Sequence, residues 1–153
     1  MVKCGLPEMR GFNIVGYQSG ANMSALALKK VHHIAIIARD YQVSKAFYCD
    51  ILGFSLVGET YRAERDSWKG ELALNGDYTL ELFSFPAPPA RVDQPEACGL
   101  RHLAFSVDDI DAAMRHLEKH GIGCEALRRD PLTGKLFTFF NDPDGLPLEL
   151  YQA

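Results

Sequence analysis

The chain has 153 residues, and 20 acidic against 16 basic side chains give it a formal net charge of −4. With 47% hydrophobic and 24% charged residues, its composition is that of an ordinary globular protein. The mild acidity argues against a nucleic-acid partner, because phosphate binding needs clustered positive charge. No apolar run approaches the ~18 residues of a membrane-spanning helix, so we expect no membrane partner.

The amino-terminal stretch carries no pattern typical of a folded element. Residues 1–22 contain four glycines and no clear hydrophobic period, so we expect residues 1–29 to form a poorly ordered extension. A signal peptide needs an apolar core of ~7–15 residues, which this stretch lacks. Met23 is an alternative candidate for the start of the chain.

The four cysteines are Cys4, Cys49, Cys98 and Cys124, and no two of them form a CxxC pair. Two disulfides in a secreted domain are one interpretation. A chain of this length, however, can build a core without such cross-links. We therefore expect reduced cysteines that pack as small apolar side chains, and a cytoplasmic protein.

From Lys30 onward the chain reads twice. His-Ile-Ala-Ile-Ile-Ala-Arg-Asp at 33–40 is matched by His-Leu-Ala-Phe-Ser-Val-Asp-Asp at 102–109. Each copy opens with a histidine and an apolar run suited to a buried strand. Asp40 and Asp109 are predicted to cap helices over 41–52 and 110–120, because their carboxylates can accept from free backbone N–H groups.

Three strand-like runs follow each predicted helix. They cover 55–62, 68–74 and 78–85 in the first copy, and 123–128, 136–140 and 147–151 in the second. Asn75-Gly76-Asp77 and Asp142-Pro143-Asp144-Gly145 are turn signals between the last two strands of each copy. Each copy is therefore predicted to be a βαβββ module in an α+β fold.

The two modules, 30–85 and 99–152, are separated by a linker over 86–98. Four of the chain's eight prolines fall in residues 86–95, and proline neither donates to a strand ladder nor continues a helix. A module of ~55 residues buries too little surface to be stable alone. We expect the modules of one domain, 30–152, to share an interface within one chain or across a dimer.

Two residue types recur at matched positions in the modules. His33 and Glu81 are 48 residues apart, and His102 and Glu149 are 47 apart. Each histidine lies on an opening strand and each glutamate lies between apolar residues of a closing strand. A buried, unpaired carboxylate is costly, and a metal ion removes that cost, although strand alternation also lets both glutamates face solvent. The pattern predicts a divalent metal site.

Other histidines are weaker candidates. His32 is expected on the opposite side of the strand from His33, exposed or behind a ligand. His116 and His120 have a helical spacing that can bind metal, but they lie on a polar face that we expect to be solvated. No Ser-His-Asp or phosphate-loop pattern is present.

The repeated motifs identify a resemblance that covers residues 30–152. His-Ile-Ala-Ile…Asp, Leu-Glu-Leu, His-Leu-Ala-Phe-Ser-Val-Asp-Asp and Phe-Asn-Asp-Pro-Asp-Gly…Leu-Glu-Leu resemble the vicinal oxygen chelate superfamily (glyoxalase I, bleomycin resistance, extradiol dioxygenase), in its glyoxalase-like, YaeR-type branch. The resemblance implies paired βαβββ modules that curl an eight-stranded, cup-like mixed sheet around one divalent metal (Ni, Zn, Co or Mn), with helices outside. The ligands carried over by position are His33, Glu81, His102 and Glu149.

The same resemblance implies a function. It points to a metal-dependent enzyme similar to lactoylglutathione lyase, which transfers a proton through a metal-stabilised enediolate. The substrate it implies is a small oxygenated molecule, and thiol adducts belong to this class. Glu149 is the expected base and Glu81 its partner. Thiol transfer to an epoxide, an epimerase, and a non-catalytic small-molecule-binding or resistance protein are the alternatives. We expect a homodimer.

The chain departs from the glutathione-using members at two positions. They carry Arg and Asn where this chain has Ile37 and Phe85, so the glutathione contacts of the family are not retained here. Other cations are candidates for binding an anionic substrate, with solvated loop charges as the alternative: Arg62, Arg65, Lys69, Arg128, Arg129 and Lys135. Trp68, Phe137 and Phe139 are candidates for lining the cup or for packing in the core.

Overall fold

The computed structural model describes residues 26–153, so Cys4, Met23 and most of the expected extension lie outside the described residues. Residues 26–30 contain no helix or strand. Val31–Ala153 forms one compact unit. None of the helices in the described residues is long and apolar enough to cross a membrane.

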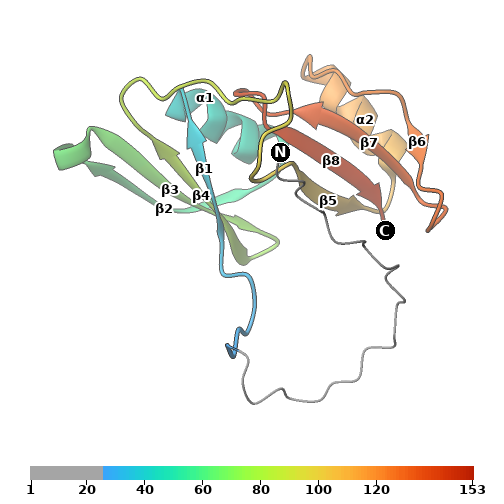
Figure 1. Ribbon diagram of the computed structural model, residues 1–153, viewed down its shortest axis with the longest axis horizontal. Helices are drawn as coiled ribbons and strands as arrows, with labels where there is room; N and C mark the ends of the chain where they lie inside the picture. Colours follow the sequence, from blue (N-terminus) through green and yellow to red (C-terminus); the bar gives the residue numbers. More distant parts are fainter. Residues whose placement is uncertain (1–25) are drawn as a thin grey trace, which may run out of the picture. The chain divides into compact units, whose positions relative to one another are not determined.

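The first module has the predicted βαβββ order. Its elements are β1 (Ile34–Ala38), α1 (Tyr41–Ala46), β2 (Ser55–Arg62), β3 (Ser67–Leu74) and β4 (Asp77–Ser84). They form a four-stranded mixed sheet in the order β1-β4-β3-β2, in which β1 and β4 are parallel (Figure 1). The hairpin between β3 and β4 turns at Asn75 and Gly76, which both have positive φ as a type I′ turn requires.

The second module repeats this arrangement. Its elements are β5 (Leu103–Val107), α2 (Ile110–Lys119), β6 (Arg128–Arg129), β7 (Leu136–Asn141) and β8 (Pro147–Gln152). The sheet order β5-β8-β7-β6, with β5 parallel to β8, corresponds strand for strand to the first sheet. The α+β fold with two such modules is confirmed, and its eight strands are divided between two four-stranded sheets.

Both helices begin where the aspartates predict. Asp40 Oδ1 accepts from the backbone N–H groups of Gln42 and Val43 at 3.0 and 3.2 Å, and Asp109 Oδ1 accepts from Ala112 at 2.8 Å. The first helical region covers nearly the predicted length. Only its first half is α-helical, however, because Phe47–Ile51 continues as a π-helical turn.

The predicted strand over 123–128 is much shorter in the structure. Only Arg128 and Arg129 pair regularly with β7. Further back, Glu125 makes one isolated backbone contact, its N–H donating to the carbonyl of Phe139 at 2.7 Å. Two residues lie between Glu125 and Arg128, whereas a single residue, Thr138, lies between their partners in β7, so the ladder is interrupted by a bulge.

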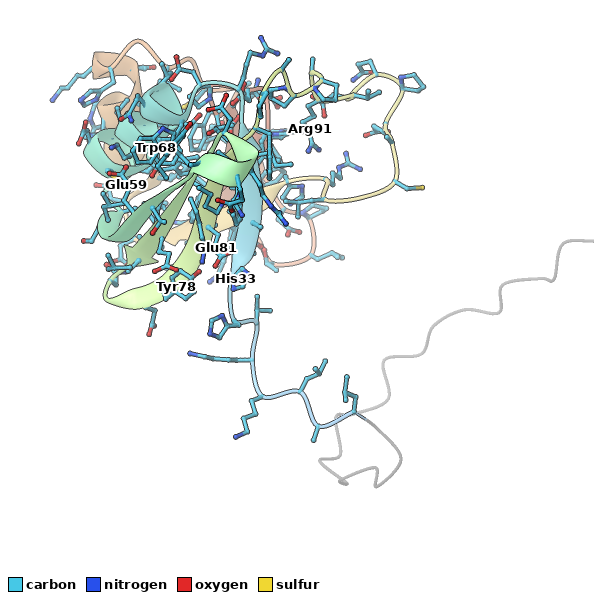
Figure 2. All side chains as sticks on the ribbon, turned by 90° about the vertical axis from the view of Figure 1, so that its left-hand side faces the viewer. His33, Glu59, Trp68, Tyr78, Glu81 and Arg91 are labelled. Atoms are coloured by element: carbon cyan, nitrogen blue, oxygen red, sulfur yellow. The ribbon has the colours of Figure 1, made fainter. Side chains whose placement is uncertain are left out.

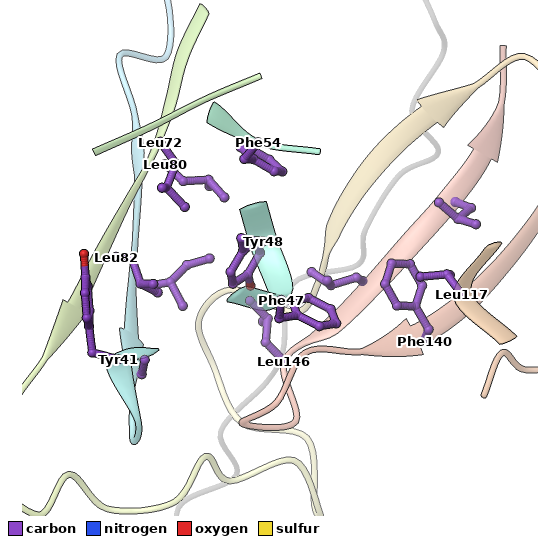
Figure 3. Packing of buried hydrophobic residues seen from close by; sticks show 14 of the residues in the cluster. Tyr41, Phe47, Tyr48, Phe54, Leu72, Leu80, Leu82, Leu117, Phe140 and Leu146 are labelled. Atoms are coloured by element: carbon purple, nitrogen blue, oxygen red, sulfur yellow. The ribbon is translucent and has the colours of Figure 1, made fainter. Parts of the chain in front are cut away.

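The two modules share one hydrophobic core. The buried cluster includes Tyr48, Leu80 and Leu82 from the first module and Phe140 and Leu148 from the second (Figure 3). Burying such side chains contributes roughly 1.5–3 kcal/mol each. This shared core is the interface that the short modules require.

Polar contacts fix the modules against each other. The Tyr48 hydroxyl donates to Asp142 Oδ2 at 2.9 Å, and both side chains are buried. Near them, the Arg39 N–H donates to Asp144 Oδ2 at 2.9 Å. Between β4 and β5 the chain contains neither helix nor strand. The side chain of Arg91 secures the end of this segment by donating to the carbonyl of Leu100 at 2.6 Å.

Candidate metal centre

The structure brings His33 and Glu81 together at one end of the first sheet. Ala35 is paired with Glu81 across the parallel β1–β4 ladder, and His33 lies immediately before β1, with its ring directed to Glu81. His33 Nε2 is 3.4 Å from Glu81 Oε2. We call this pair the first half-site.

The second module repeats the pair. Ala104 is paired with Glu149 across β5–β8, and His102 stands two residues before Ala104. His102 Nε2 is 3.2 Å from Glu149 Oε2. We call this pair the second half-site.

Exposure is also matched between the half-sites. The two histidine side chains are 35% and 32% exposed, while both glutamates are only 12% exposed. The two carboxylates are therefore largely shielded from solvent, although the leucines on either side of each glutamate point to the core on the opposite face of the sheet. In each half-site a mostly buried carboxylate lies next to the Nε2 atom of a partly exposed histidine.

Glu81 has two further partners. Lys69 Nζ lies 2.8 Å from Glu81 Oε1 and 2.7 Å from Glu71 Oε1. The Tyr78 hydroxyl also donates to Glu81, and Figure 2 shows Tyr78, Glu81 and His33 gathered at the same end of the sheet. Burial opposes ionisation of Glu81, but the hydrogen bonds from Lys69 and Tyr78 outweigh it and lower the pKa of Glu81. The first half-site thus holds a firmly ionised carboxylate.

The pKa of Tyr78 is shifted upward, opposite to that of Glu81. Its burial, reinforced by the hydrogen bond to the Glu81 carboxylate, raises the pKa of Tyr78 to about 12. The phenol therefore stays protonated at neutral pH and remains a donor to Glu81. Sequence reasoning missed Tyr78, although its place three residues before Glu81 in the hairpin is a usable signal.

The second half-site has aromatic surroundings instead. Phe139 of β7 is directly opposite Glu149, and its ring meets the His102 ring edge-on with centroids 5.2 Å apart. His102 Nδ1 is buried and has no hydrogen-bond partner among residues 26–153. A pocket of about 310 Å³ lies beside this half-site, lined by His102, Phe139, Arg128 and the linker.

The remaining histidines do not contact the glutamate of either half-site. His32 was expected on the opposite side of a strand from His33. Because β1 begins only at Ile34, strand alternation does not fix the direction of His32. Its Nδ1 lies 2.8 Å from His33 Nδ1. His116 is exposed as expected. It also contacts the first module, through Nε2 at 2.9 Å from the carbonyl oxygen of Ile51.

The three aromatic candidates do not lie on the same side of their sheets relative to the half-sites. Trp68 stacks on Tyr41, at 5.5 Å between centroids, and faces away from the half-site. Phe137 and Phe139 lie on the same face as Glu149. Ile37 lies on the His33 face, 55% exposed.

Among the cation candidates, three lie on the ligand faces. Lys69 contacts Glu81. Arg62 lies over the rings of Phe83 and Phe85, at 4.9 and 5.6 Å. Arg128 lies over Phe137 and Phe139, at 4.9 and 5.2 Å, and is paired with Glu125 at 2.9 Å. These contacts distinguish the three from ordinary loop charges.

The donor chemistry fits a borderline divalent ion. Each half-site supplies one imidazole nitrogen and one carboxylate oxygen on the same face, and such ligands suit Zn, Ni or Co. Within residues 26–153, no three histidine, cysteine or acidic side chains lie together closely enough to hold an ion. The residues of the described chain that could contribute to holding an ion are therefore two separate His–Glu pairs, with two donors each.

The three cysteines in the described part of the chain are free. Cys49 and Cys124 are half-buried, and Cys98 is exposed. Burial, together with the nearby carboxylate of Asp50, raises the pKa of the Cys49 thiol. Because a thiolate is the form that binds metal, this shift disfavours Cys49 as a ligand at neutral pH.

Two curated bacterial proteins are closely similar to this chain. The uncharacterized protein YaeR of Escherichia coli K12 is 75% identical over 127 residues, which are 83% of this chain and 98% of YaeR. The uncharacterized protein YwkD of Bacillus subtilis 168 is 61% identical over 127 residues, 83% of this chain and 99% of YwkD. A more distant relative, a lactoylglutathione lyase of Salmonella typhimurium, is 30% identical and covers 79% of this chain and 90% of its own length.

Solved structures agree with this placement. The crystal structure of a glyoxalase family protein from Enterococcus faecalis superposes with a TM-score of 0.76 at 47% identity, over 82% of this chain and 99% of that one. Residues 30–150 match the family described as the glyoxalase/bleomycin resistance protein/dioxygenase superfamily. The chain therefore belongs to this superfamily.

Proposed function

We propose that the protein is a metal-dependent lyase or isomerase of the glyoxalase I type, with a metal site built by two copies of the chain. One copy contributes the first half-site, His33 and Glu81, and the other contributes the second, His102 and Glu149. The observation that carries the proposal is the pair of matched contacts, with His–Glu distances of 3.4 and 3.2 Å on equivalent strands. The similarity to a lactoylglutathione lyase supports the reaction type.

The assembly follows from the separation of the half-sites. A single pair provides only two ligands, whereas catalytic metal sites commonly use three or more protein ligands. In a two-fold dimer each copy presents both half-sites, so two identical four-ligand sites form at once. The cup that surrounds a substrate would then have one wall from each copy.

The chain's own residues divide the chemical work. A divalent ion bound there supplies Lewis-acid stabilisation of negative charge on neighbouring substrate oxygens. Glu149 moves the carbon-bound proton, because within the described residues its carboxylate makes a polar contact with His102 alone, whereas that of Glu81 also binds Lys69 and Tyr78. General base help of this kind is worth ~10²–10⁴ in rate. Glu81 stays in place as an ionised ligand, and the Phe139 ring packs beside His102 and Glu149.

The metal part of the proposal is tested by stoichiometry. Protein stripped with chelator is dialysed against Ni, Zn, Co or Mn, and bound metal is measured by mass spectrometry. We expect about one ion per chain, and a large loss of affinity in each of H33A, E81A, H102A and E149A. The matched control is H116A, which removes an exposed histidine outside the half-sites. Unchanged stoichiometry and affinity in the four variants would overturn the proposal.

The reaction is tested with the metal-loaded protein. Methylglyoxal is offered with glutathione and with other small thiols, and the isomerised thioester is followed by its absorbance. Because Ile37 and Phe85 differ from the glutathione-using members, we expect turnover to favour a thiol other than glutathione. Tight ligand binding without turnover of any adduct would instead support a small-molecule-binding protein.

A further inference from the structure

Arg62 has an unusual position beside the first half-site. Its guanidinium carbon lies 4.9 Å from the ring centre of Phe83 and 5.6 Å from that of Phe85. The two rings stack on each other with centroids 6.2 Å apart. A guanidinium over aromatic faces is attracted by their negative electron density. The orientation of Arg62 is thus set by packing as well as by charge.

A short chain of hydrogen bonds also fixes Arg62. Its Nη2 donates to Ser67 Oγ at 2.6 Å, and the Ser67 hydroxyl donates to the carbonyl of Ser84. Ser67 is fully buried, so this support is built into the sheet. Arg62 Nε is itself buried and has no hydrogen-bond partner among residues 26–153.

The charge of Arg62 lacks a counter-charge. No carboxylate of the described residues lies within ion-pair distance of Arg62, whereas Arg128 has Glu125 at 2.9 Å and Lys69 has two glutamates. A half-buried cation without a partner is costly, because the sheet and the rings replace part of its water. A negatively charged ligand would remove that cost.

Arg62 lies on the same face of the sheet as the first half-site. Phe83 follows Glu81 by two residues on β4, so its side chain lies on the same face, ~7 Å further along. Lys69, which contacts Glu81, is directly opposite Phe83. A molecule that extends from the half-site along this face therefore passes Lys69 and reaches Arg62.

We propose that Arg62 binds a carboxylate group on the substrate, and that the protein acts on a small acid whose reacting end lies at the metal ligands. With Nε buried and one N–H of Nη2 bound to Ser67, the outer end of the guanidinium, Nη1 and the second N–H of Nη2, is left to match a carboxylate as a fork. This inference rests on the proposed function and adds the class of substrate. Arg62 is a specificity residue in this arrangement.

The test compares two hydroxamates that chelate metal identically. One is a dicarboxylic acid monohydroxamate, and the other is the hydroxamate of equal length that ends in a methyl group; acids of four to eight carbons are used. Binding to the metal-loaded protein is measured by calorimetry. We expect a preference of about ten- to a hundredfold for the acid at the best length, because a charge-assisted hydrogen bond is worth ~1.5–3 kcal/mol.

Variants assign the preference to Arg62. R62M should abolish it without changing the affinity for the methyl-ended compound. R62K, which keeps the charge but loses the fork, should retain only a small part of it and serves if R62M fails to fold. R65M is the matched control, because it removes the same charge from the adjoining turn, and it should keep the full preference.

The outcomes separate this inference from the proposed function. Equal affinity of the wild-type protein for both compounds would overturn the role of Arg62 while leaving the metal site intact. So would a preference that R62M leaves unchanged or that R65M also removes. If neither compound binds and the protein holds no metal through the four ligands, both the proposed function and this inference are wrong.

Discussion

Glu81 and Glu149 occupy equivalent positions in the two modules, yet their neighbours differ. Glu81 is contacted by His33, Lys69 and Tyr78, whereas Glu149 is contacted by His102 and faces the Phe139 ring. The histidines differ as well, because the second nitrogen of His33 lies against His32 while that of His102 is buried without a partner among the described residues.

Under the proposed function, this difference would give the two carboxylates different roles. A carboxylate held by an ammonium group and a phenol is fixed in position and ionised, so that an incoming ion need only take the place of the ammonium group. A carboxylate beside an aromatic ring has fewer bonds to break when it moves a proton. The repeat therefore supplies the same His–Glu pair twice. An ammonium group and a phenol lie beside Glu81, whereas the Phe139 ring, with Arg128 over it, lies beside Glu149.

Replacing each glutamate by glutamine should give the largest effects. At saturating metal, E149Q should lower turnover by ~10²–10⁴, the usual contribution of a general base. E81Q should act mainly by weakening metal binding, so added metal should restore much of its turnover. Steady-state kinetics over a metal titration measures both. Equal, metal-independent losses in the two variants would contradict the division of roles.

The two modules of one chain are joined by a buried hydrogen bond from the Tyr48 hydroxyl to Asp142. Y48F should lower the free energy of unfolding by ~1–3 kcal/mol, because it leaves an Asp142 oxygen buried without its donor. Denaturant unfolding should remain a single transition, since both modules contribute to one core. Two separate transitions would show that the modules do not fold as one unit.

The effect of Y48F should depend on pH. Burial raises the pKa of Asp142 above its ordinary value of 3.8, although Leu146 N–H and the Tyr48 hydroxyl counteract it. A raised carboxyl pKa means that this group's contribution to stability is fully present below about pH 3.8 and falls as the pH rises through its folded-state pKa. Y48F removes a contact that favours the ionised form. Its destabilisation should therefore be larger at pH 7 than at pH 3.

Lys69 should compete with the metal at Glu81. K69M should strengthen divalent-metal binding about tenfold, which corresponds to ~1.4 kcal/mol, because an incoming ion need no longer displace the ammonium group. The matched control is K45M, since Lys45 and Tyr41 bind Glu59 in a similar way at 2.7 and 2.9 Å, away from the half-site. Weaker metal binding by K69M would show that Lys69 supports the ligand instead.

The Glu59 contact should give the smallest effect. The hydrogen bonds from Lys45 and Tyr41 lower the pKa of Glu59, so its contribution to stability is present above pH ~4.5 and is lost as the pH falls through the folded-state pKa. K45M should cost less than ~1 kcal/mol at pH 7, because the pair is partly exposed. Thermal melts from pH 7 to pH 3 should show the gap between K45M and wild type closing.

Local patterns predicted much of this architecture. The aspartate caps, the Asn-Gly hairpin and the alternation around the ligand glutamates each depend on a few neighbouring residues, and the structure contains them. The predicted strand over 123–128 was largely wrong, because a bulge in its pairing with β7 does not show in residue alternation. The π-helical turn after Ala46 likewise follows from packing rather than from helical periodicity.

The surroundings of the ligand pairs were harder to predict. Lys69 was one of six candidate cations, and only the register of β3 against β4 brings it to Glu81. Tyr78 reaches Glu81 through the shape of the β3–β4 hairpin, and Arg62 at the end of β2 reaches Phe83 and Phe85 across β3. Such contacts depend on strand register and side-chain rotamers, which the repeat itself does not encode.

The central claim, that one metal site takes half its ligands from each of two copies, has a direct test. Two chains with different affinity tags, H33A/E81A and H102A/E149A, are co-expressed, and the heterodimer is isolated by both tags. We expect about one ion per heterodimer, because one of the heterodimer's two sites regains all four ligands, and none in either parent homodimer. A heterodimer that binds no more metal than its parents, or a protein that stays monomeric at micromolar concentration, would contradict it.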